Sequence, residues 1–531
     1  MGKLGQTEFF LKGATAPKRP KVTPAHIMAE FGCGPMPHEL SAAIGRTSNP
    51  PRRIAVDPIQ HIIAIMDRRR FLLGLAGSSA ALVGRASAQD PAMARLGVDY
   101  EAAGRAIARD FIGLSYESAV VAANDFFTAD NRTLLRLLRT LGPEGVLRIG
   151  GNTSERTLWS TQDTPAPREK FLITPFAIDR LAGFLRALGW QLIYGLNLAS
   201  GTPEEAAAEA AYVAHAVGPQ LLAFQISNEP DGFGRWSGVR PKTYDMSAFL
   251  DEWRRFQAAI RATVPDARFA GPDVAAETAW IAPFADAAPA GLVMLTQHYY
   301  ADGPASNPAV TLAKLMRSTG QIAPMLAELV AIGTAHRLPW RIAETNSVYA
   351  GGRPRVSDTL GAALWGAELM FQIAAAGGAG VNFHAGEDKV YTPISHGRGG
   401  GPTARALYYG MLMFAQATGD LVPARLDPGS TTLAAYAARA ADGLLRVVVI
   451  NKDVRAVSVW IEPRRQFAKG EVLRLTAPAL DATAGVQFGG AAVDGYGGWA
   501  PVARERARFD GGAIALDMPG AGAALLTLQV G

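Results

Sequence analysis

The stretch that decides the fold is LLAFQISNEPDGF, Leu221 to Phe233. It begins with an apolar run typical of a buried strand and ends abruptly at Asn228-Glu229-Pro230-Asp231. Pro230 lacks a backbone donor and biases Glu229 towards an extended conformation, so we expect the strand to stop there. Burying a carboxylate is costly, and an acidic residue at the carboxyl end of a buried strand often takes part in chemistry. A capping or ion-paired glutamate is the structural alternative for Glu229.

A second stretch, LPWRIAETN (Leu338 to Asn346), has the same design. Its apolar strand delivers Glu344 at its end. Two carboxylates on two strand ends are what glycoside hydrolysis needs, one as acid/base and one as nucleophile. For a retaining mechanism, the carboxyl groups of Glu229 and Glu344 are expected to lie about 5–5.5 Å apart.

Short apolar strands alternate with amphipathic helical stretches from residue 111 onward. The strand candidates are residues 111–117, 145–151, 191–198, 221–229, 267–274, 293–300, 338–346 and 378–386. Several helical stretches open with Thr or Ser caps and close at glycine. These units predict an α/β fold, a (β/α)₈ TIM barrel over residues 111–417, with its active site at the carboxyl ends of the strands. A doubly wound open sheet is the alternative, but no GxGxxG follows the first strand.

Most of the predicted strands end in polar residues. By this count Glu229 ends the fourth strand and Glu344 ends the seventh. The other polar strand-end residues are Tyr116, Glu117, Arg148, Asn197, His298, Tyr299, Tyr300, Asn382 and His384. Because the carboxyl ends of all barrel strands meet at one face, these residues together predict a catalytic mouth.

Residues 418–531 show a different pattern. Apolar residues recur at every second position, and Gly, Pro and Asp turns separate the segments, which predicts a C-terminal antiparallel β-sandwich. This part contains no constellation of acid, histidine and nucleophile, so we interpret it as a structural or binding module. Residues 90–110 form a lead-in to the barrel and are a candidate strand of the β-domain.

The composition is that of an ordinary globular protein with more than one domain. The 531 residues are 49% hydrophobic and 19% charged, with a net charge of +5. This mildly basic balance is compatible with an anionic substrate, and no Lys/Arg stripe interleaved with aromatics suggests nucleic-acid binding. Cys33 is the single cysteine, which excludes an intramolecular disulfide and a cysteine metal cluster. The histidines lack HExxH spacing, so we expect neither a metal nor another cofactor.

Residues 66–89 have the features of a twin-arginine-type signal peptide. Asp67-Arg68-Arg69-Arg70-Phe71-Leu72 precedes an apolar stretch, and Ala86-Ser87-Ala88 offers a small-residue cleavage site. The apolar stretch is too short to span a bilayer, so we expect an exported protein, periplasmic or secreted, without a membrane span. A signal peptide begins a protein, and we therefore interpret Met66 as the true start and residues 1–65 as a mis-assigned upstream extension. A disordered N-terminal arm is the alternative for residues 1–65.

Seven motifs, in this order, resemble glycoside hydrolase family 79, the heparanase and β-glucuronidase family of the retaining (β/α)₈ clan. They are Gly113-Leu114-Ser115-Tyr116-Glu117, Arg148-Ile149-Gly150-Gly151-Asn152, Asn228-Glu229-Pro230-Asp231, His298-Tyr299-Tyr300, Glu344-Thr345-Asn346, Asn382-Phe383-His384 and Tyr391-Thr392-Pro393-Ile394. The resemblance covers roughly residues 105–531, including the β-domain. The Tyr391 motif points to a uronic acid, so the implied substrate is a glucuronic-acid-containing glycoside or polysaccharide.

The resemblance implies a role for each residue of the catalytic group. Glu344 would attack the anomeric carbon, and Glu229 would protonate the leaving oxygen and then deprotonate water. Asn228 would hydrogen-bond the sugar 2-hydroxyl. Arg148 and Tyr299 would keep Glu344 ionised and oriented, because a cation and a donated hydrogen bond both favour the charged form. A barrel-mouth ion pair for Arg148 and core packing for the tyrosines are the structural alternatives.

The glycine-rich loop Ala385–Pro402 is the expected site for the sugar carboxylate. In the family the tyrosine that matches Tyr391 receives it, together with main-chain amides. Lys389 is a further candidate, although a solvated loop lysine is the alternative. Glu117 is placed to accept hydroxyl groups on the far edge of the sugar. His384 is a candidate substrate-binding residue or a structural strand-end histidine.

Two other functions remain open from the sequence. One is a retaining β-glycosidase for a neutral sugar, which a comparison of aryl glucosides with aryl glucuronides would separate from a glucuronidase. The other is an inactive polysaccharide-binding protein, which would have no need of both Glu229 and Glu344.

The signal peptide leads to a direct prediction about the mature protein. We expect cleavage after Ala88, so that intact-mass analysis of exported material gives an N-terminus near Gln89. A mature protein that still carries Cys33 would contradict both the signal-peptide interpretation and the start at Met66.

Overall fold

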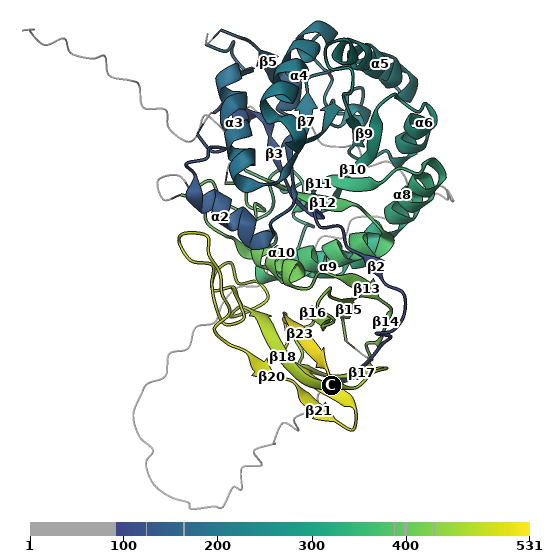
Figure 1. Ribbon diagram of the computed structural model, residues 1–531, viewed down its shortest axis with the longest axis vertical. Coiled ribbons are helices and arrows are strands. Elements are labelled where there is room, and N and C mark those ends of the chain that lie inside the picture. The colour runs from purple at the N-terminus through teal and green to yellow at the C-terminus, as the bar shows by residue number, and fades with distance from the viewer. Residues whose placement is uncertain (1–91, 124, 163–164, 387, 398–400, 430) are drawn as a thin grey trace, which may run out of the picture. The chain divides into compact units, whose positions relative to one another are not determined.

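The structure, a computed structural model, describes residues 92–531 apart from residues 124, 163–164, 387, 398–400 and 430 (Figure 1). These residues belong to one compact unit, Ser87–Gly531. The expected upstream extension (1–65) and signal peptide (66–89) lie outside the described residues. In the part of the chain that the structure describes, no helix has both the length and the apolar character needed to cross a membrane.

Eight strands form a closed parallel barrel (Figure 1). They are β3 (Ile112–Glu117), β4 (Val146–Gly150), β7 (Gln191–Leu196), β8 (Leu221–Ile226), β9 (Phe269–Val274), β10 (Leu292–Asp302), β11 (Trp340–Val348) and β12 (Gly380–Ala385). The ring closes because β12 pairs with β3, with Val381 opposite Ile112. The predicted (β/α)₈ barrel is confirmed. The doubly wound alternative was wrong, because an open sheet has two edge strands that pair on one side only, whereas every strand of this barrel pairs on both sides.

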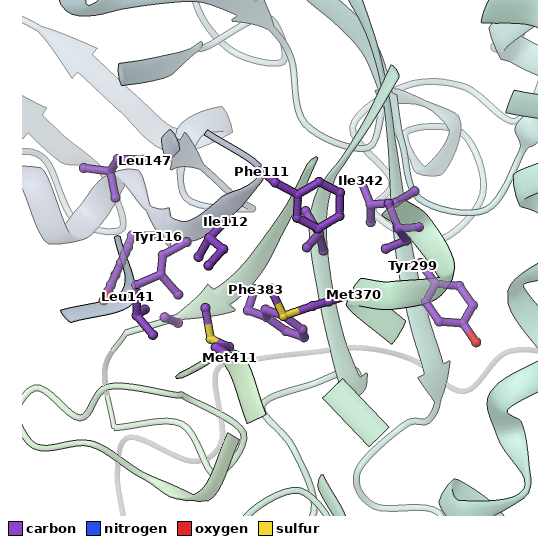
Figure 2. Packing of buried hydrophobic residues seen from close by; sticks show 14 of the residues in the cluster. Phe111, Ile112, Tyr116, Leu141, Leu147, Tyr299, Ile342, Met370, Phe383 and Met411 are labelled. Carbon is purple, nitrogen blue, oxygen red and sulfur yellow. The ribbon is translucent and has the colours of Figure 1, made fainter. Parts of the chain in front are cut away.

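Helices surround the barrel (Figure 1). The longer ones are α2 (Arg132–Leu141), α3 (Pro175–Leu188), α4 (Pro203–Val217), α5 (Met246–Thr263), α8 (Ala323–His336), α9 (Leu360–Ala376) and α10 (Ala406–Gln416), and the shorter ones are α1 (Ser118–Ala122), α6 (Ile281–Asp286) and α7 (Leu312–Met316). Side-chain caps fix where the helices start: Thr202 and Glu205 form a capping box on α4. Buried apolar side chains fill the space between strands and helices, among them Phe383 of β12, Met370 of α9 and Met411 of α10 (Figure 2).

A polar layer inside the barrel joins its strands. The buried guanidinium of Arg341 donates to Asn382 Oδ1 at 2.6 Å and to the Phe111 carbonyl at 3.0 Å. Asn382 in turn donates to the carbonyls of Leu114 and Val146, at 3.0 and 2.9 Å. Asn382 thus bonds to the strands within the barrel wall, and we assign it to the barrel's internal packing, although the sequence placed it among the polar strand ends.

Two sheets form the C-terminal β-domain. Their strands are β1 (Ala92–Val98), β2 (Arg105–Ala106), β13 (Asp420–Val422), β14 (Ala424–Asp427), β15 (Leu433–Arg439), β16 (Leu445–Asn451), β17 (Val457–Pro463), β18 (Phe467–Thr476), β19 (Gln487–Phe488), β20 (Glu505–Arg506), β21 (Arg508–Asp510), β22 (Ala513–Met518) and β23 (Gly522–Val530). One sheet has the order β14-β1-β17-β22-β21 and the other β19-β18-β23-β16-β15-β13-β2. The pairings are antiparallel except that of β1 with β17, and one apolar cluster joins both sheets. The predicted antiparallel β-sandwich is confirmed.

The β-domain packs firmly on the outside of the barrel helices. Phe371 of α9 stacks on Tyr436 of β15, with ring centroids 4.6 Å apart and planes 12° apart. Lys452, just after β16, places its Nζ 2.6 Å from Oε2 of Glu368 on α9, and the two side chains are only 4% and 5% exposed. Burying two charges is favourable only while they remain paired. This ion pair therefore makes the attachment specific.

The buried ion pair predicts a non-additive effect on stability. Lys452→Met leaves the Glu368 carboxylate buried without its cation, and we expect it to lower the free energy of unfolding by about 3 kcal/mol. The double change Lys452→Met with Glu368→Leu should recover most of that loss. Urea denaturation of the full chain measures both.

The matched control for this experiment is an exposed ion pair. Arg95 and Glu462 lie 2.8 Å apart with side chains 66% and 49% exposed, so Arg95→Met should cost less than about 1 kcal/mol. If the urea midpoint of Lys452→Met is no lower than that of Arg95→Met, the buried ion pair does not have the stabilising role assigned to it.

Candidate active site

Glu344 lies in the middle of a buried set of hydrogen-bond donors. It belongs to β11, and its side chain is 8% exposed. Arg148 of β4 donates to its Oε2 at 2.7 Å, and the Tyr300 hydroxyl of β10 donates to its Oε1 at 2.7 Å. His384 Nδ1 of β12 lies 3.4 Å from Oε2. Three strands thus fix one carboxylate.

The surroundings of Glu344 favour its charged form. Burial opposes ionisation, but the positive charges of His384, His298 and Arg148 and the hydrogen bond from Tyr300 outweigh it and lower the pKa of Glu344 to about 2. Glu344 is therefore an oriented carboxylate at neutral pH, which is the state that a nucleophile requires.

Glu229 lies in a tight turn after β8. Strand β8 ends at Ile226, and both Ser227 (φ 92°) and Glu229 (φ 49°) have left-handed backbones. The extended conformation expected for Glu229 was wrong because tertiary hydrogen bonds hold this turn. The Glu229 amide donates to the Asp273 carbonyl at 2.9 Å, and the Asn228 amide donates to Glu155 Oε1 at 2.6 Å.

Asp231 clamps the far side of the same turn. Its carboxylate accepts the amides of Ala275, Ala276 and Glu277 at 2.9, 2.9 and 3.0 Å. Asp231 therefore connects the loop after β8 to the loop after β9. Hydrogen bonds at Glu229 itself and at Asp231 together stabilise the strained backbone of Glu229.

The surroundings of Glu229 favour its neutral form. Burial raises its pKa, a hydrogen bond and positive charge from His298 lower it, and the negative charges of Glu344 and Asp231 raise it, with a net shift upward. Its side chain keeps 17% of its surface exposed. One oxygen of Glu229, one of Glu344 and a nitrogen of His298 all lie within 4.8 Å of one another. Two close carboxyl groups with opposite pKa shifts are typical of an acid and a nucleophile.

Arg148 connects most of the site through its guanidinium, which is fully buried. Besides Glu344, it donates to Asp273 Oδ2 at 2.5 Å, Asn228 Oδ1 at 2.8 Å, Gln225 Oε1 at 2.9 Å and Ser115 Oγ at 3.1 Å. The motif around it reflects this packing. A Cβ on Gly150 would lie 2.5 Å from the guanidinium carbon, so only glycine fits there.

The sequence assigned the tyrosine contact on Glu344 to the wrong residue. Tyr300 makes this contact, whereas the Tyr299 side chain lies in the apolar cluster (Figure 2). Side chains alternate along a strand, so Tyr300 shares the inward face of β10 with His298, and Tyr299 points to the opposite face. Tyr299 is the core aromatic that the sequence held as the alternative.

Glu117 and His384 lie side by side at the ends of β3 and β12. Glu117 Oε2 accepts the Thr153 amide at 2.8 Å and its hydroxyl at 2.7 Å, and Oε1 lies 3.6 Å from His384 Nε2. Burial opposes its ionisation, but the hydrogen bond and charge of His384, the Lys389 charge and the Thr153 hydrogen bond lower the pKa of Glu117 to about 2. A Cβ on Gly151 would lie 2.5 Å from Glu117 Oε2.

Tyr391 is brought to the same mouth by the loop after β12. Its ring centroid lies 6.3 Å from that of Tyr300 and 6.0 Å from that of His384. Asn346 Nδ2 donates to the Tyr391 carbonyl at 3.3 Å. Burial, and then the negative charges of Glu344 and other carboxylates, raise the pKa of Tyr391, so its phenol stays a donor. Lys389 is half-buried on this loop.

Sequence reasoning placed His298 among the polar strand ends without giving it a role, and it missed Asp273 and Gln225. His298 bridges Glu229 Oε1 (3.0 Å) and Asp273 Oδ1 (3.1 Å), and Gln225 binds both Arg148 and Asp273. His298 and Asp273 are polar residues near strand ends, and Gln225 interrupts an apolar strand. Such interruptions, combined with strand alternation, are the sequence signal that could have found them.

The cluster of Glu229, His298 and Glu344 offers donor atoms that could converge on a cation. Burial lowers the pKa of His298, but the Asp273 and Glu344 charges and the hydrogen bonds to Asp273 and Glu229 raise it to about 10. A protonated imidazole has no lone pair to give a metal. The hydrogen bond between His298 and Glu229 and the charge attraction between His298 and Glu344 therefore explain the cluster better than metal ligation does.

Comparisons with known proteins agree with the resemblance found in the sequence. Residues 435–525 match the model of the glycosyl hydrolase family 79 C-terminal beta domain. A beta-glucuronidase of Aspergillus niger is 27% identical over 60% of this chain and 66% of its own length, so the match spans just under two thirds of that relative. A beta-glucuronidase of Neurospora crassa is 26% identical over 61% of this chain and 67% of its own length.

Solved structures share the fold at lower sequence identity. A 4-O-alpha-L-rhamnosyl-beta-D-glucuronidase from Fusarium oxysporum 12S has a TM-score of 0.69 at 21% identity, covering 81% of this chain and all of its own. The family GH51 arabinofuranosidase from Xanthomonas axonopodis pv. citri has a TM-score of 0.61 at 16% identity, covering 82% of this chain and all of its own. The barrel with an appended β-domain is thus an architecture found in glycoside hydrolases.

Proposed function

We propose that this chain is a retaining glycoside hydrolase that removes β-linked glucuronic acid from a glycoside or polysaccharide. The observation that carries the proposal is the pair Glu229 and Glu344, two close carboxyl groups with opposite pKa shifts. Their nearest oxygens lie within 4.8 Å, which supports retention, since inverting enzymes separate the carboxyl groups by about 6.5–9.5 Å. The similarity to two fungal beta-glucuronidases supports the choice of sugar.

In the first step Glu344 attacks the anomeric carbon. The bond from carbon to the leaving oxygen breaks, and that oxygen takes the proton of Glu229. A glycosyl ester on Glu344 results, and Glu229 becomes a carboxylate. The low pKa of Glu344 keeps the nucleophile charged, and the upward shift in the pKa of Glu229 favours the protonated form that this step uses.

In the second step water completes the reaction. Glu229, now a base, removes a proton from water while the water oxygen bonds to the anomeric carbon. The ester bond breaks, and Glu344 recovers its charge. Because each step inverts the anomeric centre, the product keeps the configuration of the substrate.

Other residues of the site orient the reacting groups. Arg148 and Tyr300 hold both oxygens of Glu344, so its attacking lone pair has a fixed direction. Arg148 also holds Asn228 Oδ1. Asn228 Nδ2 donates one N–H to Asn152 Oδ1 at 3.3 Å, which leaves its second N–H to meet the sugar 2-hydroxyl. We assign Glu117 and His384 to hydroxyl groups on the other edge of the sugar, because both lie beside Glu344 and are themselves held in place.

The sugar carboxylate is assigned to the loop after β12. Tyr391 has its hydroxyl beside Tyr300, and the raised pKa of Tyr391 keeps that hydroxyl a donor. Lys389 adds a positive charge close enough to lower the pKa of Glu117. Several described amides of this loop, such as those of Lys389, Val390 and Thr392, already donate to carbonyls within the chain, so the assignment rests on Tyr391 and Lys389. A neutral sugar would leave these donors unpaired, which costs affinity.

We further propose that the chain is exported in its folded state. The support is the motif Asp67-Arg68-Arg69-Arg70-Phe71-Leu72 followed by a short apolar stretch. Export gives a glycosidase access to extracellular polysaccharides.

The proposal is tested by a substrate panel. Matched 4-nitrophenyl β-glucuronide and β-glucoside, together with glucuronic-acid-containing polysaccharides, should show release of glucuronic acid and little glucose. NMR of the first-formed sugar should show the β-anomer. If the glucoside is hydrolysed faster than the glucuronide, the assignment of glucuronic acid is wrong and a neutral sugar takes its place. The α-anomer as the first product would rule out a retaining mechanism. Binding of polysaccharide without any release would favour the inactive binding protein.

The two adjacent tyrosines give a matched pair of variants. Tyr300→Phe removes a hydrogen bond to a charged carboxylate, and we expect kcat/KM on 4-nitrophenyl glucuronide to fall about 10- to 100-fold. Tyr299→Phe should stay within about 3-fold of wild type, because its side chain lies in the apolar cluster. Equal losses in both variants would show that the site does not depend on the Tyr300 contact.

Tyr391 tests carboxylate recognition separately from catalysis. We expect Tyr391→Phe to lower kcat/KM for the aryl glucuronide by about 10- to 100-fold, the loss of one charge-assisted hydrogen bond. The much weaker hydrolysis of the matching glucoside should barely change. Equal losses on both substrates would mean that Tyr391 supports the mouth of the barrel and does not read the carboxylate.

A further inference from the structure

His298 is buried between two carboxylates. Its Nδ1 lies 3.0 Å from Glu229 Oε1, and its Nε2 makes an ion-pair contact of 3.1 Å with Asp273 Oδ1. The side chain has 0% of its surface exposed. The imidazole therefore contacts the proposed acid/base directly, although the mechanism above gives it no role.

Asp273 is itself held rigidly. It accepts hydrogen bonds from Arg148 Nη2 at 2.5 Å and from Gln225 Nε2 at 2.6 Å, and its backbone is left-handed, with φ 67°. An aspartate held by two donors has little freedom to move, so its negative charge stays 3.1 Å from His298 Nε2. The ring then presents Nδ1–H to Glu229.

The charged groups around His298 are Glu229 after β8, Asp273 of β9, Glu344 of β11 and Arg148 of β4. Burial disfavours the imidazolium, but the negative charges of Asp273 and Glu344 and the hydrogen bonds to Asp273 and Glu229 raise the pKa of His298 to about 10. His298 therefore keeps its proton over the neutral range. It acts as a fixed cation and not as a proton shuttle.

Two charges act on Glu229 in opposite directions. The carboxylate of Glu344 raises its pKa, and His298 lowers it through a hydrogen bond and a positive charge. In the glycosyl-enzyme Glu344 is a neutral ester, so its negative charge no longer acts on Glu229 or on His298. The carboxylate of Asp273, which contributes more than Glu344 to the raised pKa of His298, remains 3.1 Å from Nε2. The balance at Glu229 then moves from acid towards base.

We propose that His298, held by Asp273, is the positioning residue that makes Glu229 a base for hydrolysis of the glycosyl-enzyme. The inference rests on the proposed function. In this step Glu229 takes a proton from water, the water oxygen bonds to the anomeric carbon, and the electron pair of the ester bond returns to Glu344. His298 donates its Nδ1–H to Glu229 throughout and neither gains nor loses a proton.

The test is His298→Asn, which keeps a neutral donor near the Nδ1 position and removes the charge. With 2,4-dinitrophenyl glucuronide the leaving group needs no proton, so formation of the glycosyl-enzyme does not require an acid. We expect a burst of one dinitrophenolate per active site, followed by a steady state about 10- to 100-fold slower than wild type. Azide should restore the turnover, because it attacks the glycosyl-enzyme without a general base.

The pH profile separates an electrostatic role from a structural one. Loss of the positive charge raises the pKa of Glu229, so the alkaline limb of kcat/KM for phenyl glucuronide should move to higher pH in His298→Asn. The matched control is His384→Asn, because His384 contacts Glu344 and not Glu229. It should shift only the acid limb upward, through a raised pKa of Glu344, and azide should not restore it.

The proposal would be overturned if His298→Asn slowed formation and hydrolysis of the glycosyl-enzyme alike, left the alkaline limb unchanged and did not respond to azide. Asp273→Asn is the second variant, since it retains the imidazole and removes the carboxylate that keeps it charged. It should give the same azide response, or the proposal fails. The wild-type chain is first tested on 2,4-dinitrophenyl glucuronide and glucoside. All variants are then compared on whichever of the two it hydrolyses. An error in the assigned sugar is thereby distinguished from an error about His298.

Discussion

The active site depends on one buried guanidinium. Arg148 has no exposed surface and donates to residues of four other strands or their ends, including the carboxylates of Asp273 and Glu344. A buried cation is tolerated only when fully paired, so these strands must close around it before the charge is compensated. The constraint that completes the barrel therefore also assembles the site.

The opposite pKa shifts of the two glutamates follow from the sign of the charges beside each of them. Positive and negative groups alternate along the chain of contacts that leads from Arg148 to Glu229. Glu344 is next to Arg148 and His384, which favour its carboxylate. Glu229 does not contact Arg148 directly: Arg148 binds Asp273, Asp273 contacts His298, and His298 contacts Glu229. Glu229 also faces the negative charge of Glu344. Burial raises the free energy of both carboxylates, and the neighbouring charges then lower the pKa of Glu344 and leave that of Glu229 raised. In this network one carboxyl group cannot be changed without affecting the other.

Much of this could be predicted from the sequence because the relevant patterns are local. Apolar runs ending in polar residues predicted eight strands close to their observed bounds, and period-two alternation predicted the β-sandwich. Asn228-Glu229-Pro230 and Glu344-Thr345-Asn346 identified the two carboxylates, since a costly acid after a buried strand is visible in one dimension. The glycines after Arg148 were also visible, although the reason for them, room for a guanidinium and for Glu117, was not.

What remained depended on contacts between distant strands. Which tyrosine reaches Glu344 was decided by the inward face of β10, which Tyr300 shares with His298, so the choice of Tyr299 was wrong. The left-handed backbone of Glu229 is imposed by Asp273 and Glu155, residues far away in the chain. The protonation states arise from charges that only closure of the barrel brings within reach. The sequence by itself determined which groups are present and on which strands, because chain-local patterns encode them. Tertiary structure alone decided their partners and charge, because those depend on distances across the barrel.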